Sequence, residues 1–344
     1  MMEQTEAESK CRILAIETSC DETAVAIVEN GKRVLSSVVS SQSNIHEKYG
    51  GVVPEVASRK HVETITIMIE EALREAQVQR EQLSAIAVTQ GPGLVGALLI
   101  GLVAAKALSF AWNLPLIGVH HIAGHIYANR IEAPITFPSM ALIVSGGHTE
   151  LIHMKMEGSF HIVGQTRDDA VGEAYDKVAR ALSLPYPGGP HIDRLAGEAD
   201  GAVKFPRAWL EPGSYDFSFS GLKSAVLNYL NQAKMAGEQV VPAEVAKGFQ
   251  DSVIDVLVEK SVRAVQDHDV KELLLGGGVA ANRGLRETLR ARCAEEGITL
   301  RIPPLSLCTD NAVMIGAAAY LKWISAQYSA LTIQAEPLLS LEAW

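Results

Sequence analysis

The sequence predicts an α/β protein that is built from two related halves. Its 344 residues exceed what one hydrophobic core usually serves, and an apolar fraction of 48% is enough for two cores. Residues 13–37 and 141–166 share one pattern, in which apolar strands alternate with short polar or glycine-bearing turns. Residues 85–108 and 273–293 share a second pattern of strand, glycine-rich turn and helix. We therefore expect a sheet with flanking helices in each half.

The duplication also predicts how the chain is divided. The expected parts, in chain order, are a solvated tail (1–12), a first half (13–138), a second half (139–325) and a C-terminal tail (326–344). Residues 200–226 are rich in Gly, Pro, Ser and aromatics and lack periodicity, so we interpret them as an insertion or a lid. Residues 243–265 carry apolar side chains at helical spacing, which indicates an amphipathic helix on a sheet. The last helices can pack back on the first half.

Composition and charge indicate a cytoplasmic protein without a membrane segment. The net charge is −10, so any contact with nucleic acid needs a local basic patch. The N-terminal residues are acidic and lack the apolar core of a signal peptide. The longest apolar run, residues 94–112, contains Lys106 and is shorter than about 20 apolar residues, so we interpret it as a buried helix. Four scattered cysteines without a CxxC pair indicate reduced thiols, and none of these cysteines argues for zinc.

Two histidines four residues apart are the clearest sign of chemistry. His121 and His125, in "VHHIAGHIYA", lie on one face of a helix, where both imidazoles can reach one ion. Residues 115–125 and 300–316 occupy matching places in the two halves, so Asp310 corresponds in position to the histidines. Two histidines and a carboxylate leave open positions on a metal, which is typical of a working site. A pair of core and surface histidines is the structural alternative.

Three turns together indicate a nucleotide site. "ETSCDET" joins two strands, and "SGGHTE" repeats this design with two glycines whose backbone N–H groups can approach an anion. "GGGVAANRGLR" leads into a helix whose N-terminus favours negative charge. Asp176 and Asp193 flank Gly188 and Gly189, and taken alone they are helix caps or surface charges. Each turn alone is more often just a turn, so the hypothesis depends on the combination.

Motifs of one protein family run along the chain in that family's order. The signature is "KALSFAWNLPLIGVHHIAGHI", residues 106–126. The others are "IETSCDETAVAIV", "GGVVPEVASRKH", "TQGPGLVGALLIG", "SGGHTEL", "GEAYDKVA", "YPGGPHID", "FSFSGLKSAV", "GGGVAANRGLR" and "CTDNAVMIG". From Ile13 to about Tyr320 the chain resembles the TsaD family, formerly Gcp or "O-sialoglycoprotein endopeptidase" and related to the Kae/OSGEP proteins. "IETSCDET" and "FSFSGLK" resemble its bacterial or organellar branch.

The resemblance implies both a fold and a reaction. The fold is that of the actin, hexokinase and Hsp70-like (ASKHA) ATPases, with two RNase H-like halves and a central ligand cleft. The reaction transfers the threonylcarbamoyl group from threonylcarbamoyl-AMP to N6 of the adenosine 3′ of the anticodon, in tRNAs reading ANN codons. AMP is the leaving group.

The resemblance also assigns the site residues. Metal ligands fall on His121, His125 and Asp310, with one Fe2+ per subunit as the usual metal and zinc or another divalent ion as the alternative. Substrate contacts fall on Val144, Ser145, Gly146, Gly147, His148, Asp176, Gly189, Asp193 and Asn282. The chain keeps all of these residue types. Asp21 is our candidate for the general base, and His120, which the family does not assign to the metal, is expected to be a supporting or structural residue.

These residue types suit the implied chemistry. An aromatic amine is a poor nucleophile, and a metal with open positions can act as a Lewis acid on the carbamoyl carbonyl. The glycine turns are expected to bind the phosphate of AMP, and Asn282 with the helix start at Gly278 to hold its sugar and base.

Partners follow from the resemblance alone. They are tRNA, threonylcarbamoyl-AMP and, in a bacterial member, the paralogue TsaB and the ATPase TsaE, while organellar members can act without these two proteins. No membrane is expected. The candidates for tRNA phosphate contacts, which are otherwise solvated charges, are Arg59, Lys60, Lys204, Arg207 and Lys223.

The residues argue against three other functions. A protease of the HExxH kind has a Glu between its histidines as general base, whereas "HIAGH" has Ile, Ala and Gly there, so protease activity is disfavoured. An ATPase or phosphotransferase of the same fold has no evident use for two histidines and a distant Asp. A non-catalytic scaffold of the same complex would lose the metal ligands, which are all present here.

Overall fold

The computed structural model describes residues 10–344, so nearly all of the predicted N-terminal tail lies outside the described residues. The chain divides into two compact units. Unit 1 contains the residues up to Ser40, Ser58–Ile131 and Asn311–Leu339. Unit 2 contains Ser41–Ala57, Glu132–Asp310 and Ser340–Trp344. The continuous halves expected from the sequence stay a prediction.

Unit 1 is built on a mixed sheet. Within residues 10–344 this sheet has five strands in the order β3-β2-β1-β4-β5. They are β1 (Arg12–Glu17), β2 (Glu22–Glu29), β3 (Arg33–Ser41), β4 (Ala85–Gly91) and β5 (Leu116–His120). β1 is antiparallel to β2 and parallel to β4, and β4 is parallel to β5. The carboxyl ends of β1, β4 and β5 therefore meet at one edge of the sheet.

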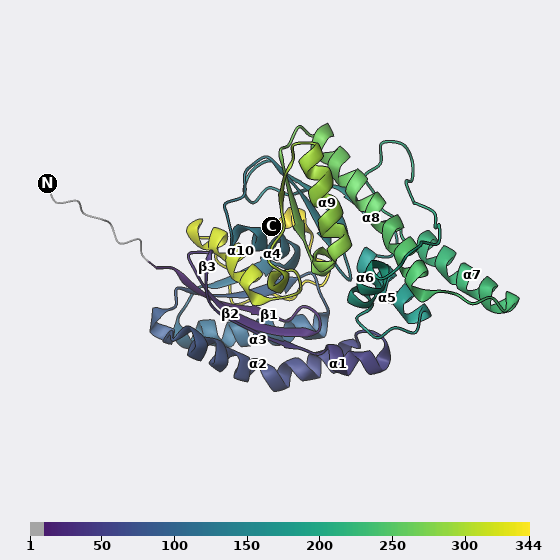
Figure 1. The fold of residues 1–344 in the computed structure, drawn as a ribbon. Coiled ribbons are helices and arrows are strands. Elements are labelled where there is room, and N and C mark those ends of the chain that lie inside the picture. The colour runs from purple at the N-terminus through teal and green to yellow at the C-terminus, as the bar shows by residue number, and fades with distance from the viewer. Residues whose placement is uncertain (1–9) are drawn as a thin grey trace. The chain divides into compact units, whose positions relative to one another are not determined.

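Helices cover the sheet of unit 1. They are α2 (Pro54–Ala76), α3 (Val95–Trp112), α4 (His121–Tyr127) and α10 (Ala312–Ile324). α2 and α3 run along the same side of β1 and β2 (Figure 1), and Ile65, Ile69 and Leu102 from these helices join the core beneath the strands. α10 packs on β1, β2 and β5 and also contacts α4. The short helix α4 is thus held between the end of β5 and α10.

Helix α3 corrects one prediction from the sequence. We expected the apolar run to be a buried helix, but only one third of α3 is buried. Ala97, Leu102 and Ala105 face the core, whereas Val103 and Phe110 are 61% and 78% exposed. Among the described residues α3 is the one helix that is long and apolar enough to cross a membrane, by length and composition only. The prediction failed because apolar residues cover the outer face of α3 as well as the inner one.

Unit 2 repeats the sheet of unit 1. In the described part of the chain its sheet has five strands in the order β10-β9-β6-β7-β8. They are β6 (Ser139–Val144), β7 (Thr149–Met154), β8 (His161–Gln165), β9 (Glu272–Gly276) and β10 (Thr299–Arg301). β6 is antiparallel to β7 and parallel to β9, as β1 is to β2 and β4. The duplication predicted from the sequence is confirmed at the level of strand order and direction.

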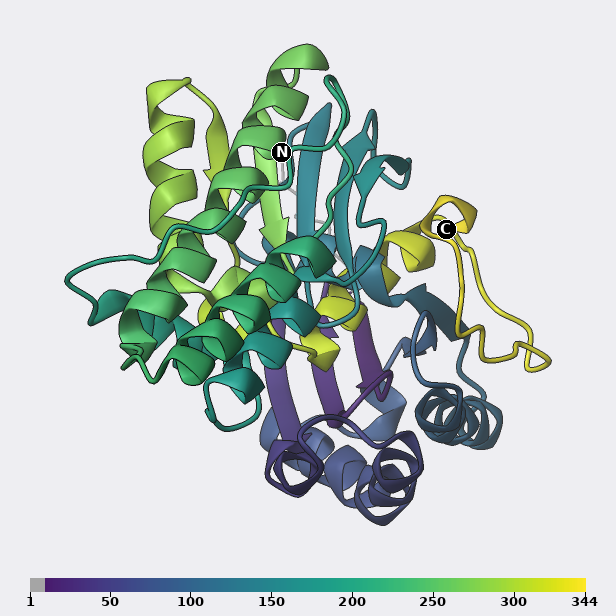
Figure 2. The same ribbon diagram turned by 90° about the vertical axis from the view of Figure 1, so that its right-hand side faces the viewer.

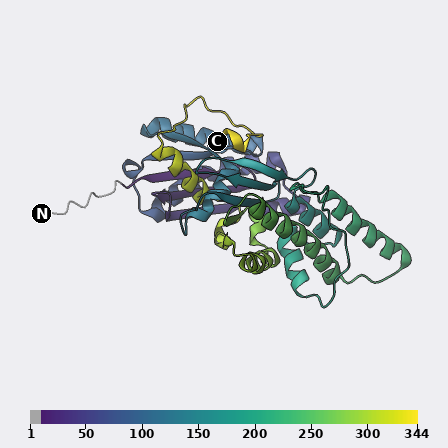
Figure 3. The ribbon, with the colours of Figure 1, turned by 90° about the horizontal axis from the view of Figure 1, so that it is seen from above.

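Five helices enclose the core of unit 2 in the described part of the chain. They are α5 (Val171–Ala181), α6 (Gly188–Gly197), α7 (Ser220–Ala236), α8 (Pro242–Asp267) and α9 (Arg283–Glu295). The short helix α1 (Ser43–His46) also belongs to unit 2. α8 is the predicted amphipathic helix and is drawn in green in Figure 3. It buries Phe249 and Leu257. Before α7 the chain lacks helices and strands between about residues 198 and 219. The Asp168 carboxylate anchors the end of this loop, because it accepts hydrogen bonds from the hydroxyls of Ser218 and Ser220.

All four cysteines, each within the described residues, are free thiols. Burial raises the pKa of Cys11 and of Cys293 to about 11, and it also raises the pKa of Cys308. Cys20 lies half-buried in the turn between β1 and β2.

Iodoacetamide at pH 8 is therefore expected to alkylate Cys20 first in the native protein. The thiolate is the reacting form, and a raised pKa keeps the other three thiols protonated at this pH. Peptide mass spectrometry over a time course measures the order, and the denatured chain, in which all four should react alike, is the control. Faster labelling of Cys11 or Cys293 in the native chain would contradict the described burial.

Candidate functional site

Helix α4 carries the two predicted metal-binding histidines. β5 ends at His120, and α4 starts with the next residue. His121 and His125 are 6% and 0% exposed, and their ring centroids lie 4.7 Å apart at an interplanar angle of 86°. Gly124 lets α10 approach, because a Cβ there would lie 3.0 Å from Ile315 Cδ1 and 3.2 Å from Met314 Cγ. The i and i+4 spacing thus places two imidazoles on one face, as predicted.

Asp310 completes a group of possible metal ligands. The ligand atoms of His121, His125 and Asp310 all lie within 4.8 Å of one another. Asp310 directly precedes Asn311, whose side chain accepts a hydrogen bond from the Met314 amide and caps α10. Two imidazoles and one carboxylate suit a divalent transition metal and leave further positions for a substrate. The structure therefore contains a possible His-His-Asp metal site of the composition predicted from the sequence.

A buried carboxylate that the sequence analysis missed orients His121. Glu17, at the end of β1, is fully buried, and its Oε2 lies 3.2 Å from His121 Nδ1. Ser19 Oγ lies 3.1 Å from the same nitrogen, and the Thr89 hydroxyl donates to Glu17 Oε2 at 2.5 Å. A carboxylate at Nδ1 is typical of a carboxylate–histidine–metal triad, in which the other ring nitrogen would bind the metal. The one sequence signal was an acidic residue directly after the apolar run Ile13–Ile16.

The segment before Asp310 is held by Arg286 of α9. The Arg286 guanidinium donates to the carbonyls of Ala280 at 3.1 Å and Pro303 at 3.3 Å, and it contacts Cys308 Sγ at 3.5 Å. Its planar fork thus ties the turn after β9, the turn after β10 and the residue two positions before Asp310 to one another. Arg286 is a second residue that the sequence analysis did not single out for this role.

The "SGGHTE" turn of unit 2 is a tight hairpin between β6 and β7. Two hydrogen bonds close it. The Ser145 amide donates to the His148 carbonyl at 2.8 Å, and the His148 amide donates to Ser145 Oγ at 3.1 Å. A Cβ on Gly146 or Gly147 would meet no atom within 4 Å, and neither glycine has a positive φ. The chain itself therefore does not require glycine here, and the open space suits the close approach of a ligand. Val144, by contrast, is a fully buried strand residue.

Asp176 and Gly189 lie where α5 and α6 meet. Asp176 Oδ1 accepts a hydrogen bond from the Gly188 amide at 2.7 Å, which is the helix-capping role named as its structural alternative. Gly189 follows in α6, and a Cβ on it would meet no atom within 4 Å. Gly188 is closed in, because its Cβ would lie 2.3 Å from that of Ala179. Of the two adjacent glycines, only Gly189 thus faces open space.

Asp193 and Asn282 hold the start of α9. Asp193 accepts from the Arg283 amide at 2.8 Å and from Gln250 Nε2 at 3.0 Å. Asn282 Oδ1 accepts from the Leu285 amide at 2.8 Å, and its Nδ2 donates to Gln250 Oε1 at 2.8 Å. Gln250, which the sequence analysis missed, therefore joins two of the predicted substrate contacts. Their contacts with a substrate stay a prediction.

For the other predicted residues, the surroundings do not identify a role in the site. Asp21 is 9% exposed in the turn between β1 and β2, and its role as general base stays a prediction. Three candidate phosphate contacts already hold acidic partners, and these pairs are Lys60 with Glu63 at 2.9 Å, Arg207 with Asp255 at 2.7 Å and Lys223 with Asp169 at 2.6 Å. Because their charges are already paired, these three side chains contribute less to the local basic patch that a chain of net charge −10 needs to bind nucleic acid.

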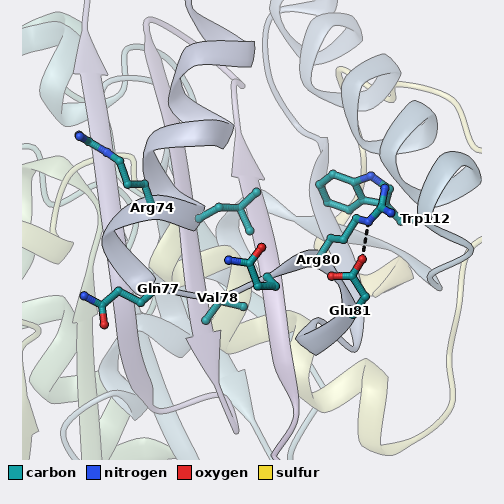
Figure 4. A pocket seen from close by; sticks show the side chains of 8 residues that line it. Arg74, Gln77, Val78, Arg80, Glu81 and Trp112 are labelled. Carbon is teal, nitrogen blue, oxygen red and sulfur yellow. Dashed lines mark hydrogen bonds and ion pairs between the residues drawn. The ribbon is translucent and has the colours of Figure 1, made fainter.

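A separate pocket in unit 1 contains none of the predicted site residues (Figure 4). It lies at the end of α2 and beside the end of α3, and its lining residues are Leu73, Arg74, Gln77, Val78, Gln79, Arg80, Glu81 and Trp112. Arg80 is paired with Glu81 there. The predicted site residues therefore lie outside this pocket.

The two sheets of equal strand order define the class of the protein, the ASKHA ATPase-like fold. Solved structures support this class through their fold alone. HypF from T. kodakarensis matches with a TM-score of 0.63 at 14% identity, and the match covers 93% of this chain and 48% of the HypF chain. Component A of (R)-2-hydroxyglutaryl-CoA dehydratase from Acidaminococcus fermentans has a TM-score of 0.55 at 16% identity, with 91% and 98% covered.

Sequence comparison shows the family within this class. The family model described as TsaD, tRNA N6-adenosine threonylcarbamoyltransferase, matches residues 33–317. A protein of that name from Halalkalibacterium halodurans is 62% identical over 330 residues, 96% of each chain. Another from Bacillus subtilis strain 168 is 60% identical over 333 residues, again 96% of each chain. The chain belongs to the TsaD family.

Replacement of Glu17 by Gln is expected to weaken metal binding by about 10- to 100-fold, because Glu17 orients His121 and raises its basicity as a ligand. Competition with a chelator measures the affinity of the purified chain for a divalent metal. Glu63→Gln, which removes an exposed carboxylate on α2, is the matched control. Equal affinities of the two variants would contradict the role given to Glu17.

Two glycine variants distinguish a glycine that leaves space for a ligand from a glycine that the fold requires. Gly147→Ala is expected to change the free energy of unfolding by less than about 0.5 kcal/mol but to weaken AMP binding, since the new methyl group enters open space. Gly277→Ala is expected to destabilise the chain by more than about 1 kcal/mol, because Gly277 has a φ of +89° and its Cβ would lie 2.3 Å from the Val144 carbonyl oxygen. Urea unfolding and AMP calorimetry distinguish the two, and unchanged AMP binding by Gly147→Ala would contradict the assignment of this turn.

Proposed function

We propose that this chain transfers the threonylcarbamoyl group from threonylcarbamoyl-AMP to N6 of the adenosine 3′ of the anticodon in tRNAs reading ANN codons. The observation that carries the proposal is the intact group His121, His125 and Asp310, within 4.8 Å, in a chain about 60% identical to relatives named for this activity. A fold of this class alone would support many functions, so the site and the identity are both needed.

The reaction is an acyl transfer to nitrogen. The N6 amine attacks the carbamoyl carbonyl carbon, a C–N bond forms, and the C–O bond of the mixed anhydride breaks. AMP departs with that electron pair, and the N6 proton passes to a base. Asp21, buried at the end of the first hairpin, is our proposal for this base.

We assign the adenylate to the glycine turns and helix starts of unit 2. Gly146, Gly147 and Gly189 face open space, which suits the binding of phosphate oxygens by backbone amides. Val144, Ser145 and His148 shape that turn, while Asp176, Asp193 and Asn282 hold the starts of α6 and α9 in place. Their rigid hydrogen bonding favours a site that is formed before the ligand arrives.

We propose Fe2+ as the metal at His121, His125 and Asp310, with zinc or another divalent ion as the alternative. The support is the donor set, two nitrogens and one oxygen, together with the carboxylate of Glu17 behind His121. When bound, such a metal supplies Lewis-acid polarisation of a carbonyl oxygen. The chain's own contribution is to hold His121 through Nδ1 and Asp310 through the segment anchored by Arg286.

The proposed partners are tRNA, threonylcarbamoyl-AMP, the paralogue TsaB and the ATPase TsaE, in the cytoplasm. The exposed apolar side chains Val95, Leu99, Val103 and Phe110 on α3 support a protein partner, since contiguous apolar surface commonly marks an interaction site. The relatives from Halalkalibacterium halodurans and Bacillus subtilis are bacterial proteins, which favours the bacterial set of partners.

Loss of the two histidines is expected to abolish the modification in vivo. A strain depleted of its own enzyme receives either this chain or the variant His121→Ala/His125→Ala, and threonylcarbamoyladenosine is quantified in digested tRNA by mass spectrometry. We expect restoration by the unchanged chain alone, because the variant lacks two of its three metal ligands.

Expression levels and thermal melting of both chains are the controls. Restoration by both chains would remove the metal from the essential chemistry. Suppose that neither chain restores the modification although both are folded and matched partners are present. That result would favour an ATPase or phosphotransferase function, or a scaffold role in the same complex.

A further inference from the structure

The chain that follows α10 is not a loose tail. After Ile324 it has no helix until Leu341–Ala343, and Figure 2 shows it as a long yellow loop. Its first anchor is on β5, where the Ser329 amide donates to the Leu116 carbonyl at 2.7 Å and Ser329 Oγ accepts from the Gly118 amide at 3.0 Å. We call residues 329–339 the C-terminal strap.

A second anchor joins the strap to the end of β4. The Glu336 amide donates to the Gln90 carbonyl at 2.9 Å, and Gln90 Nε2 donates to Glu336 Oε1 at 2.6 Å. The Gly93 amide donates to the Pro337 carbonyl at 3.3 Å. The strap thus crosses the sheet edge at which β4 and β5 end.

At two positions beside the strap, only glycine leaves enough room for the strap. A Cβ on Gly118 would lie 2.4 Å from Ile333 Cδ1, and a Cβ on Gly91 would lie 1.9 Å from the Glu336 carbonyl oxygen. Neither glycine has a positive φ, so the close approach of the strap explains them better than backbone conformation does.

The strap ends on the residue before the first metal ligand. The Leu339 carbonyl accepts a hydrogen bond from His120 Nε2 at 3.0 Å, while His120 Nδ1 accepts one from the Ile122 amide at 3.1 Å. The second contact is the N-cap of α4. One buried imidazole therefore connects the strap to the first turn of the helix that carries His121 and His125.

We propose that the C-terminal strap is part of the metal site, with His120 as the positioning residue through which it acts. α4 has seven residues, too few to be stable alone, so its direction depends on its cap and its packing. The strap holds the His120 ring in the orientation that caps α4, and this preorganises both histidines for a divalent cation. The inference rests on the proposed function only in taking His121 and His125 as metal ligands.

Two truncated chains test the strap. One ends at Ala335 and loses Glu336–Leu339 with the rest of the C-terminus, while the control ends at Ser340 and keeps them. Both lose the buried Leu341 and the contact of Trp344 with Phe160, so the pair differs only in residues 336–340, which include the last four residues of the strap. Titration with Co2+, followed by visible absorption, is expected to give at least a tenfold weaker Kd for the shorter chain and an unchanged Kd for the control.

A point variant keeps the test decisive if the shorter chain does not fold. In the full-length chain His120→Asn retains a capping oxygen for the Ile122 amide but is too short to reach the Leu339 carbonyl. We expect weaker Co2+ binding with little change in thermal unfolding, and no further loss when the variant is combined with the shorter chain.

The readout separates this inference from the proposed function, because Co2+ binding needs neither tRNA nor threonylcarbamoyl-AMP. Wild-type Co2+ affinity in His120→Asn would overturn the positioning role, whatever the transferase assay shows. Equal affinity of the two truncated chains, both folded, would overturn the strap. Additive losses in the combined variant would show that strap and His120 act separately, which also overturns it.

Discussion

Helix α4 begins directly at the end of a buried strand and carries both histidines of the candidate metal site within seven residues. A helix of this length has no independent stability, so its orientation is imposed by its neighbours. Glu17 holds the ring of His121 from the sheet, α10 approaches closely at Gly124, and His120 caps the first turn. The chemistry proposed for the chain depends on this constraint, because a metal site tolerates little error in ligand position.

In unit 2 the predicted site residues are also held by their neighbours, mainly through hydrogen bonds at the starts of helices. Most of its predicted substrate residues lie near helix starts and in a two-glycine hairpin, and backbone amides at such places commonly bind anions. The glycines fall into two classes. Gly188 and Gly277 are closed in by Ala179 and Val144, whereas Gly146, Gly147 and Gly189 face open space that the chain does not use. The second class is the one that a ligand can explain.

Local patterns in the sequence predicted much of this. Strand and turn periodicity predicted the duplicated sheets, and the i, i+4 spacing predicted two imidazoles on one face of α4. Residues that act across long separations escaped prediction. Glu17 is 104 positions from His121, and Leu339 is 219 positions from His120, so neither contact leaves a local signal. The outer face of α3 escaped for a different reason, because hydropathy alone does not distinguish a buried face from an exposed apolar one.

Transfer by the purified chain in vitro tests the central claim most directly. The metal-free protein, with its partner proteins, is given threonylcarbamoyl-AMP made from labelled threonine and an unmodified tRNA, before and after addition of Fe2+. The account predicts that Fe2+ restores incorporation of label by the unchanged chain and not by Asp310→Asn, which keeps the size of the side chain but loses the charged ligand. Transfer by the metal-free chain at the rate of the loaded chain would contradict it.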